Sequence, residues 1–306
     1  MKVPSVVDSG VYCIWSGAAT CGEGPVWIPE QSALYWVDID GCKAHRYDIT
    51  DKQVTTWTLV EKTGWLLPCH GRKEFIAGCK SGVYLIDLDA GGQTLLFDPE
   101  HDQPHNRFND AKTDSQGRIW AGTMRDSGPE KTGWLYRIQS DLSYQRCDGP
   151  YAVTNGPAIS PDDGILYHVD THGGVVYAFD KNSDGGLENR RVFVTIDELD
   201  GRPDGLTVDN DGYVWIAHWG GYRLTRFTPD GRVDGIVPIP APQVTSCTFG
   251  GADMSTLFIT SAARNVDLKI YPNAGGLFCV DTSVTGKVVE PFRMSDCAAP
   301  LSTGIT

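Results

Sequence analysis

The 306-residue sequence lacks several features that would place it in a common class. No apolar run approaches the ~20 residues that a membrane-spanning helix needs, and the N-terminus MKVPSVVDSGVYCIW has no continuous apolar segment typical of a signal peptide. No long stretch has helical periodicity. Neither a Gly-x-Ser-x-Gly nor a His-Glu-x-x-His motif occurs. We therefore expect no membrane partner, and the sequence indicates neither a serine nucleophile nor a histidine-based zinc site.

The cysteines form no recognisable pattern. Their number is odd, no Cys-x-x-Cys pair occurs, and several lie in apolar stretches such as GGLFCVD. Buried thiols in a reducing compartment account for this best, so we expect a cytoplasmic protein without a cysteine-ligated zinc ion. The nine are Cys13, Cys21, Cys42, Cys69, Cys79, Cys147, Cys247, Cys279 and Cys297.

Basic residues are also few. The chain has 26 Lys and Arg against 39 Asp and Glu, which gives a net charge of −13 at pH 7. Such a surface repels a phosphate backbone, so we do not expect nucleic acid as a partner. A channel lined by carboxylates would, in contrast, attract a metal cation.

The sequence does contain a sixfold internal repeat. Each copy has an apolar run, a turn such as SPDDG or DNDG, and strands marked by an aromatic or large apolar residue. Successive markers are 40, 44, 47, 48 and 43 residues apart, which matches one four-stranded propeller blade of roughly 40–50 residues. The markers are Trp36, Ile76, Trp120, Tyr167, Trp215 and Phe258.

This repeat predicts an all-β fold, a six-bladed β-propeller formed by a single domain of residues 1–306. Asp-Gly and Gly-Gly dipeptides between the strands supply the positive φ angles of tight hairpins. The strand VYCIW precedes the first complete copy, so we expect residues 10–16 to pair with the last blade, because closure removes an exposed edge. A closed propeller needs no partner to cover its edges, and we expect a monomer.

One phase of the repeat is polar. Glu23, Asn109, Asn155 and Asp204 lie 13, 11, 12 and 11 residues before their markers. Equivalent positions of a propeller converge on its axis, so Glu23, Asn155 and Asp204 are expected to meet. Two carboxylates and an amide oxygen suit Ca²⁺, Mg²⁺ or Mn²⁺, and Zn²⁺ or Fe²⁺ also bind such ligands. The alternative is that these residues and the glycines beside them only form tight turns.

The same segments resemble the regucalcin/gluconolactonase family, also called senescence-marker or luciferin-regenerating-enzyme-like proteins. Within that family the chain looks most like bacterial aldonolactonases of sugar-oxidation pathways. It departs from the family pattern at His218 and in the loop of residues 125–132. The resembling stretches are GEGPVW (22–27), LYWVDI (34–39), NRFNDAKTDSQGRIWAGTM (106–124), TNGPAISPD (154–162), RPDGLTVDNDGYVWIAHWGG (202–221) and TSCTFGG (245–251).

The resemblance implies a propeller enzyme with one catalytic divalent metal ion that hydrolyses a sugar lactone to the aldonic acid. It implies Glu23, Asn155 and Asp204 as metal ligands, and Arg107 and Asn109 as residues that contact substrate hydroxyls. The metal would polarise the lactone carbonyl, and either Asp204 or a metal-bound hydroxide would activate the water. A carboxylate bound to a cation is a weakened base, so both remain open.

Two other interpretations fit the same pattern. The first is a calcium-dependent propeller hydrolase of phosphotriesters or aryl esters. The second is a non-enzymatic calcium-binding propeller, whose channel metal only stabilises the fold. The sequence also leaves open whether Trp65, Trp219 and Tyr222 form pocket walls or pack between strands.

Overall fold

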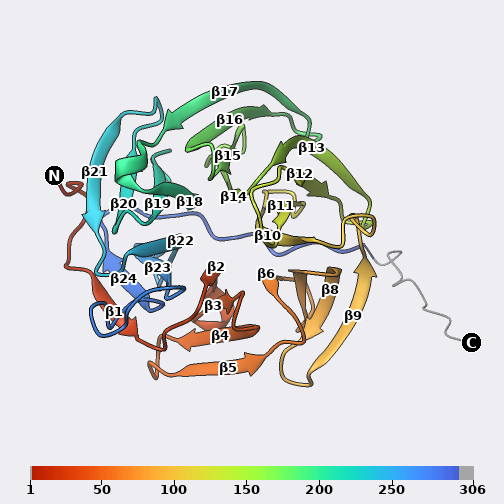
Figure 1. Cartoon of the computed structure of the whole chain (residues 1–306), viewed down its shortest axis with the longest axis horizontal. Coiled ribbons are helices and arrows are strands. Elements are labelled where there is room, and N and C mark those ends of the chain that lie inside the picture. The colour runs from red at the N-terminus through yellow and green to blue at the C-terminus, as the bar shows by residue number, and fades with distance from the viewer. Residues whose placement is uncertain (1, 296–306) are drawn as a thin grey trace, which may run out of the picture.

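The structure is a computed structural model that describes residues 2–295, which are almost entirely β-strands around a central axis (Figure 1). No helix in this part of the chain has the length and apolar character needed to cross a membrane. The free cysteines are Cys13, Cys21, Cys42, Cys69, Cys79, Cys147, Cys247 and Cys279, whereas the predicted thiol at Cys297 lies outside the described residues.

In the described residues four sheets have four antiparallel strands each, in chain order from the inside outward. The first comprises β2 (Gly22–Ile28), β3 (Ala33–Asp38), β4 (Lys43–Asp48) and β5 (Val54–Thr58), and the second comprises β6 (Thr63–Pro68), β7 (Phe75–Cys79), β8 (Gly82–Asp87) and β9 (Gly92–Phe97). The third comprises β10 (Asn106–Thr113), β11 (Ile119–Arg125), β12 (Gly133–Ile138) and β13 (Tyr144–Tyr151), and the fourth comprises β14 (Thr154–Ile159), β15 (Ile165–Asp170), β16 (Val175–Lys181) and β17 (Leu187–Thr195).

The other eight strands of the described chain form one sheet. They are β18 (Arg202–Val208), β19 (Val214–Trp219), β20 (Arg223–Phe227), β21 (Val233–Pro238), β22 (Gln243–Gly250), β23 (Thr256–Ala262), β24 (Leu277–Asp281) and β1 (Tyr12–Trp15). This sheet consists of two four-stranded units, joined by the single pair of Trp219 with Gln243. The predicted all-β propeller is confirmed. The predicted six blades appear as five sheets in the described residues, because this pair joins two neighbouring four-stranded units into one sheet.

The innermost strands form a closed ring around the axis. β2, β6, β10, β14, β18 and β22 each contact the next strand in this series, and β22 contacts β2 in turn. The ring closes through the N-terminal strand β1, which pairs antiparallel with β24. The predicted pairing of residues 10–16 with the last unit is confirmed, and it covers the edge of β24.

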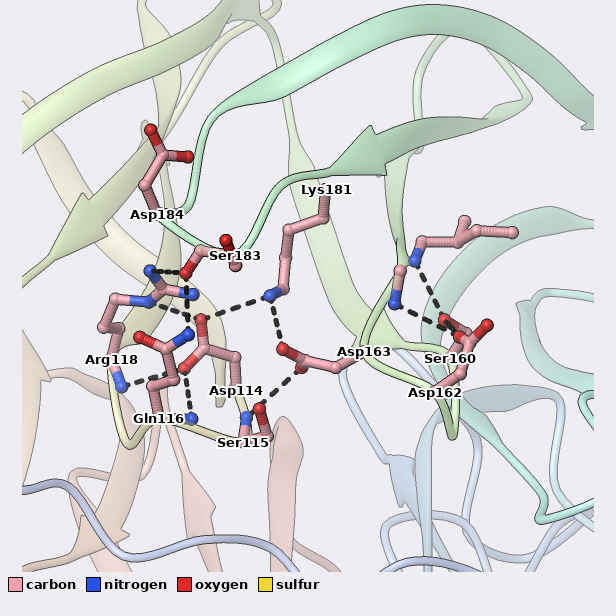
Figure 2. A network of polar contacts seen from close by, with 12 residues as sticks. Asp114, Ser115, Gln116, Arg118, Ser160, Asp162, Asp163, Lys181, Ser183 and Asp184 are labelled. Atoms are coloured by element: carbon pink, nitrogen blue, oxygen red, sulfur yellow. Dashed lines mark hydrogen bonds and ion pairs between the residues drawn. The ribbon is translucent and has the colours of Figure 1, made fainter.

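The turns that leave the innermost strands are held by buried aspartates. Asp114, after β10, accepts hydrogen bonds from Arg118 Nε at 2.7 Å and from the indole of Trp120 at 3.1 Å. Figure 2 shows Asp114 between Arg118 and Lys181, and Lys181 also pairs with Asp163 at 2.7 Å. These contacts anchor a repeat marker, Trp120, to its own turn.

The C-terminal segment of residues 282–295, which we call the strap, crosses the ring (Figure 1). It accepts hydrogen bonds from the ends of the innermost strands and the turns after them: Asn210 N donates to Thr285 O, and Thr113 Oγ1 donates to Glu290 O. Phe292 is fully buried in a cluster that includes Trp65 and Phe108. The strap therefore lies at the end of the channel where the innermost strands finish.

Candidate functional site

Every innermost strand has a break in its pairing register close to the polar phase of the repeat. A β-bulge of this kind bends the strand and redirects a side chain. The breaks lie between Glu23 and Val26, Thr63 and Trp65, Phe108 and Ala111, Asn155 and Ala158, Pro203 and Leu206, and Val244 and Ser246. One local device, repeated around the ring, thus presents the predicted residues at one level.

Glycines allow these bulges for two different reasons. Gly24 has a φ of 55° and Gly156 a φ of 70°, and side chains disfavour this left-handed conformation. Gly64 is needed for space, because a Cβ there would lie 2.6 Å from the carbonyl oxygens of Phe108 and Asn109. The alternative considered from the sequence, that these residues only form tight turns, differs from the structure, because Glu23, Asn155 and Asp204 lie within β2, β14 and β18.

The structure brings all five predicted site residues to one cavity of about 220 Å³ at the end of the channel opposite the strap. They are Glu23, Arg107, Asn109, Asn155 and Asp204. The cavity is also lined by His172 and by residues that we did not predict from the sequence, namely Cys21, Met124, Val153, Thr171, Arg202 and Arg264.

The sequence left open whether three aromatic residues form pocket walls or pack between strands, and the structure places them differently. Trp219 lines the cavity, whereas Trp65 is buried in a hydrophobic cluster beside Phe108. Tyr222 lies outside the cavity and contacts Tyr271.

Two buried acids, Glu23 and Asp204, line this cavity, and a third, Asp110, lies close enough for its charge to act on both. Burial, reinforced by the charge of Asp110, raises the pKa of Glu23 to about 8. Burial raises the pKa of Asp110 to about 6, against the opposing charge of Lys112. Burial and the charges of Glu23 and Asp110 raise the pKa of Asp204 well above its usual range. Like charges held together out of water disfavour ionisation, so this group of side chains gains most from a bound cation.

Hydrogen bonds fix the amide members of the site. Asn155 Oδ1 accepts from Asn109 Nδ2 at 2.9 Å, and Asn155 Nδ2 donates to Thr171 Oγ1 at 2.9 Å. Asn109 Nδ2 also donates to Thr154 O at 2.6 Å. Both N–H groups of Asn109 are thus used within the protein, while Asn155 Oδ1 keeps a second lone pair. Asn109 therefore orients Asn155.

Arg107 has an internal partner as well as a place in the cavity. Its Nη1 donates to Asn109 Oδ1 at 2.6 Å and its Nε to Asp126 Oδ1 at 3.1 Å. The guanidinium carries further donors, so the salt bridge with Asp126 does not preclude contact with a ligand.

The donor set fits a divalent cation with oxygen ligands. Asp204 Oδ1 and Asp110 Oδ2 are buried and have no hydrogen-bond partner in the described residues, and a buried polar atom without a partner is costly. No cluster of three or more His, Cys, Asp or Glu side chains suited to a metal occurs in residues 2–295. The predicted set has two such carboxylates and an amide, and this composition favours hard cations.

The fold and the site together define a β-propeller with a buried acidic cavity at one end of its channel. The family model described as "SMP-30/Gluconolactonase/LRE-like region" matches residues 21–263. The chain belongs to this family, as its motifs predict.

Relatives cover nearly the whole chain. It is 35% identical to the 6-deoxy-6-sulfogluconolactonase of Pseudomonas putida over 97% of this chain and 100% of that protein. It is 32% identical to the L-arabinolactonase of Azospirillum brasilense over 89% of this chain and 92% of that protein. The crystal structure of regucalcin from Agrobacterium tumefaciens strain C58, described as a calcium-binding protein, matches with a TM-score of 0.88 and 25% identity over 94% of this chain and 98% of that one.

Proposed function

We propose that this protein hydrolyses a sugar lactone to the corresponding aldonic acid and that it needs one divalent metal ion to do so. The observation that carries the proposal is the meeting of Glu23, Asn155 and Asp204 in one cavity, where Asp204 Oδ1 lacks a partner. Relatives named as a sulfogluconolactonase and an arabinolactonase support the reaction class.

Glu23, Asn155 and Asp204 would hold the metal. When bound, such an ion supplies a Lewis acid that draws electron density from the lactone carbonyl. Its identity stays open among Ca²⁺, Mg²⁺, Mn²⁺, Zn²⁺ and Fe²⁺, and the regucalcin described as calcium-binding supports Ca²⁺.

The protein's own side chains carry the remaining steps of the proposal. Asp204 accepts a proton from the water that attacks the carbonyl carbon. The ring C–O bond then breaks, and its oxygen takes up the proton that Asp204 received, so that it becomes a hydroxyl of the aldonic acid and Asp204 is ionised again. Arg107 holds the sugar hydroxyls with its Nη2 donors, which its hydrogen bonds to Asp126, Asn109 and Phe108 O leave free. Asn109 keeps Asn155 in place through its amide hydrogen bond.

The proposal also includes the setting of the site. We treat the eight-stranded sheet as two blades, which gives the six blades that the repeat predicts. Free cysteines in the described residues support a cytoplasmic location. The antiparallel pair of β1 with β24 covers an edge and supports a monomer.

Acid release from a panel of lactones tests the function. The protein would be stripped of metal, reloaded with each of the five cations and given xylono-, arabinono-, galactono- and gluconolactone. We expect metal-dependent hydrolysis with a preference among the four. Hydrolysis of none of them by any metal form would refute the lactonase proposal. A phosphotriester in the same panel tests the alternative hydrolase.

Calcium binding without catalysis is a second candidate, favoured by the description of the regucalcin structure. It predicts thermal stabilisation by Ca²⁺ and no turnover of any substrate in the panel.

A further inference from the structure

Positive charge is concentrated in a network that reaches the cavity through Arg107 and Arg264, although the whole chain carries a net charge of −13. Asp126 accepts ion pairs from three cations, with Lys62 at 2.8 Å, Arg107 at 3.1 Å and Lys80 at 3.3 Å. Although burial opposes ionisation, the hydrogen bond from Lys62 and the charge of Arg107 hold the pKa of Asp126 at about 2. One negative charge therefore faces three positive charges.

The same network continues to Asp40. This carboxylate pairs with Lys62 at 3.2 Å and with Arg264, which lines the cavity. Four cations thus share two carboxylates, and with the nearby carboxylate of Glu61 counted one positive charge stays in excess. Glu61 lies nearby, and its carboxylate accepts hydrogen bonds from Ser81.

Arg202 adds a further cation on the other side of the cavity. Its side chain is 44% exposed, and in the described residues its one ion pair is with Glu198 at 3.6 Å, which is beyond hydrogen-bond distance. Glu198 is itself 87% exposed, so water screens this pair. Burial and the charge of Arg202 lower the pKa of His172, which also lines the cavity. Arg202 therefore presents a guanidinium to the cavity with its donors free.

A neutral sugar lactone can accept hydrogen bonds from these cations through its hydroxyls, but it carries no negative charge to balance theirs. The acids at the base of the cavity, Glu23 and Asp204, are assigned to the metal in the proposed function. In the proposed function, a lactone whose carbonyl reaches that metal would extend toward the other residues that line the cavity, which include Arg202 and Arg264. An anionic group at the far end of the sugar would meet them, and a planar guanidinium binds sulfonate, phosphate or carboxylate with paired charge-assisted hydrogen bonds.

We propose that the substrate is an acidic sugar lactone and that Arg202 binds its anionic substituent at the end remote from the lactone ring. This inference rests on the proposed lactonase function and specifies the substrate class of the same site. Arg264 and the network around Asp126 add a favourable potential that attracts the anion to the cavity.

Paired substrates and matched variants test the inference. The metal-loaded protein would be assayed with gluconolactone and with three lactones of the same ring that carry a 6-sulfonate, a 6-phosphate or a 6-carboxylate. The variant R202Q removes the charge, and R202K keeps the charge without the planar pair of donors. R191Q is the control, since Arg191 on the outer strand β17 has a similar 45% exposure and lies outside the cavity.

We expect the wild-type kcat/KM to be at least tenfold higher for one of the three acidic lactones than for gluconolactone. The acidic lactone with the highest kcat/KM identifies the anionic group that the site binds. R202Q should lower kcat/KM for that lactone by 30-fold or more, mainly through KM, and by at least ten times more than for gluconolactone. R202K should lose less kcat/KM for the acidic lactone than R202Q does, and R191Q should leave kcat/KM unchanged for both substrates. Added salt should raise KM for the acidic lactone only.

Each failure has its own signature. Equal rates on neutral and acidic lactones would overturn the inference and leave the lactonase proposal standing. If R202Q lowered kcat/KM equally for the acidic lactone and for gluconolactone, the role of Arg202 would be overturned. Hydrolysis of no lactone at all would refute the proposed function, and this inference with it.

Discussion

At the scale of single residues, the protein places its ionisable groups where their charges are costly. Glu23, Asp110 and Asp204 are each at most 4% exposed. Isolated buried carboxylates either take up a proton or bind a cation. Their raised pKa values are thus the physical counterpart of a metal site.

The charge on Glu23 predicts how stability depends on pH. Because its folded pKa of about 8 lies above the unfolded value, its contribution to stability is full at low pH and is lost as pH rises through 8. The metal-free wild type should lose on the order of 1 kcal/mol of unfolding free energy between pH 7 and 8.5. E23Q should lose less, and divalent metal should remove the difference in the wild type. Urea unfolding at these two pH values measures it.

Between pH 7 and 8.5, the buried histidines do not add an opposite pH dependence to the stability. Burial lowers the pKa of His168 to about 3, and that of His45 and His218 to about 4. These groups contribute stability that is fully present above their unfolded pKa and is lost as pH falls toward their folded values. A slope of equal size in E23Q and the wild type would contradict the account of Glu23.

Asp204 gives the second prediction at this scale. D204N removes the proposed base and one metal ligand, so we expect kcat to fall by roughly 100-fold or more. D211N, on an exposed turn after the same innermost strand, is the matched control and should retain activity. Near-normal turnover of metal-loaded D204N would disprove the role of Asp204 as a base.

The sequence predicted the polar residues of the cavity that share one phase of the repeat, but not the arginines Arg202 and Arg264 that also line it. Glu23, Asn155 and Asp204 occupy one phase of a repeat, and a closed ring must bring one phase together. Arg202 was missed because an exposed arginine carries no sequence pattern, and Arg264 was missed because it follows β23 in a loop outside the polar phase. The free donors of Arg202 become visible only when its neighbours are known.

At the scale of elements, the polar phase works because it coincides with a bulge in each innermost strand. Alternation and aromatic markers predicted the strands, since these patterns fit a half-buried pleated surface. The bulges were not predicted, because a pair such as Asp-Gly is compatible with both a turn and a bulge. Only the pairing of Pro203 and Leu206 with β19 distinguishes the two at Asp204.

The buried turn of Asp209 offers a prediction about stability. Asp209 Oδ2 accepts from the indole of Trp215 at 2.9 Å and from Arg226 Nη2 at 2.7 Å, with all three side chains buried. D209A would leave the Arg226 charge without this partner and should lower the unfolding free energy by about 3–5 kcal/mol.

D211A, two residues away and exposed, is the control for this change and should stay within about 0.5 kcal/mol of the wild type. Chemical denaturation of the two variants compares them directly. A loss below 1 kcal/mol in D209A would mean that the turn is held mainly by its backbone.

At the scale of the whole molecule, the two terminal segments of the described chain close the propeller in different ways. β1 pairs with β24, and the strap crosses the opposite end of the channel from the cavity. The first closure was predicted, because the strand at residues 10–16 had no other partner in the repeat. The strap was not predicted, because the repeats end before it and its backbone bonds depend on turns that are distant in sequence.

The strap yields the last stability prediction. Phe292 is fully buried beside Trp65 and Leu67, so F292A should lower the unfolding free energy by about 3–5 kcal/mol. The cavity lies at the other channel end, so KM for the lactone should change little. A large change in KM with unchanged stability would show that the strap acts on the site rather than on the fold.

The most direct test of the central claim is the initial rate of lactone hydrolysis as divalent metal is returned to the metal-free protein. The account predicts almost no rate without metal, a linear rise up to one equivalent, and no rise in E23Q at the same metal concentration. A full rate in the metal-free protein would contradict it.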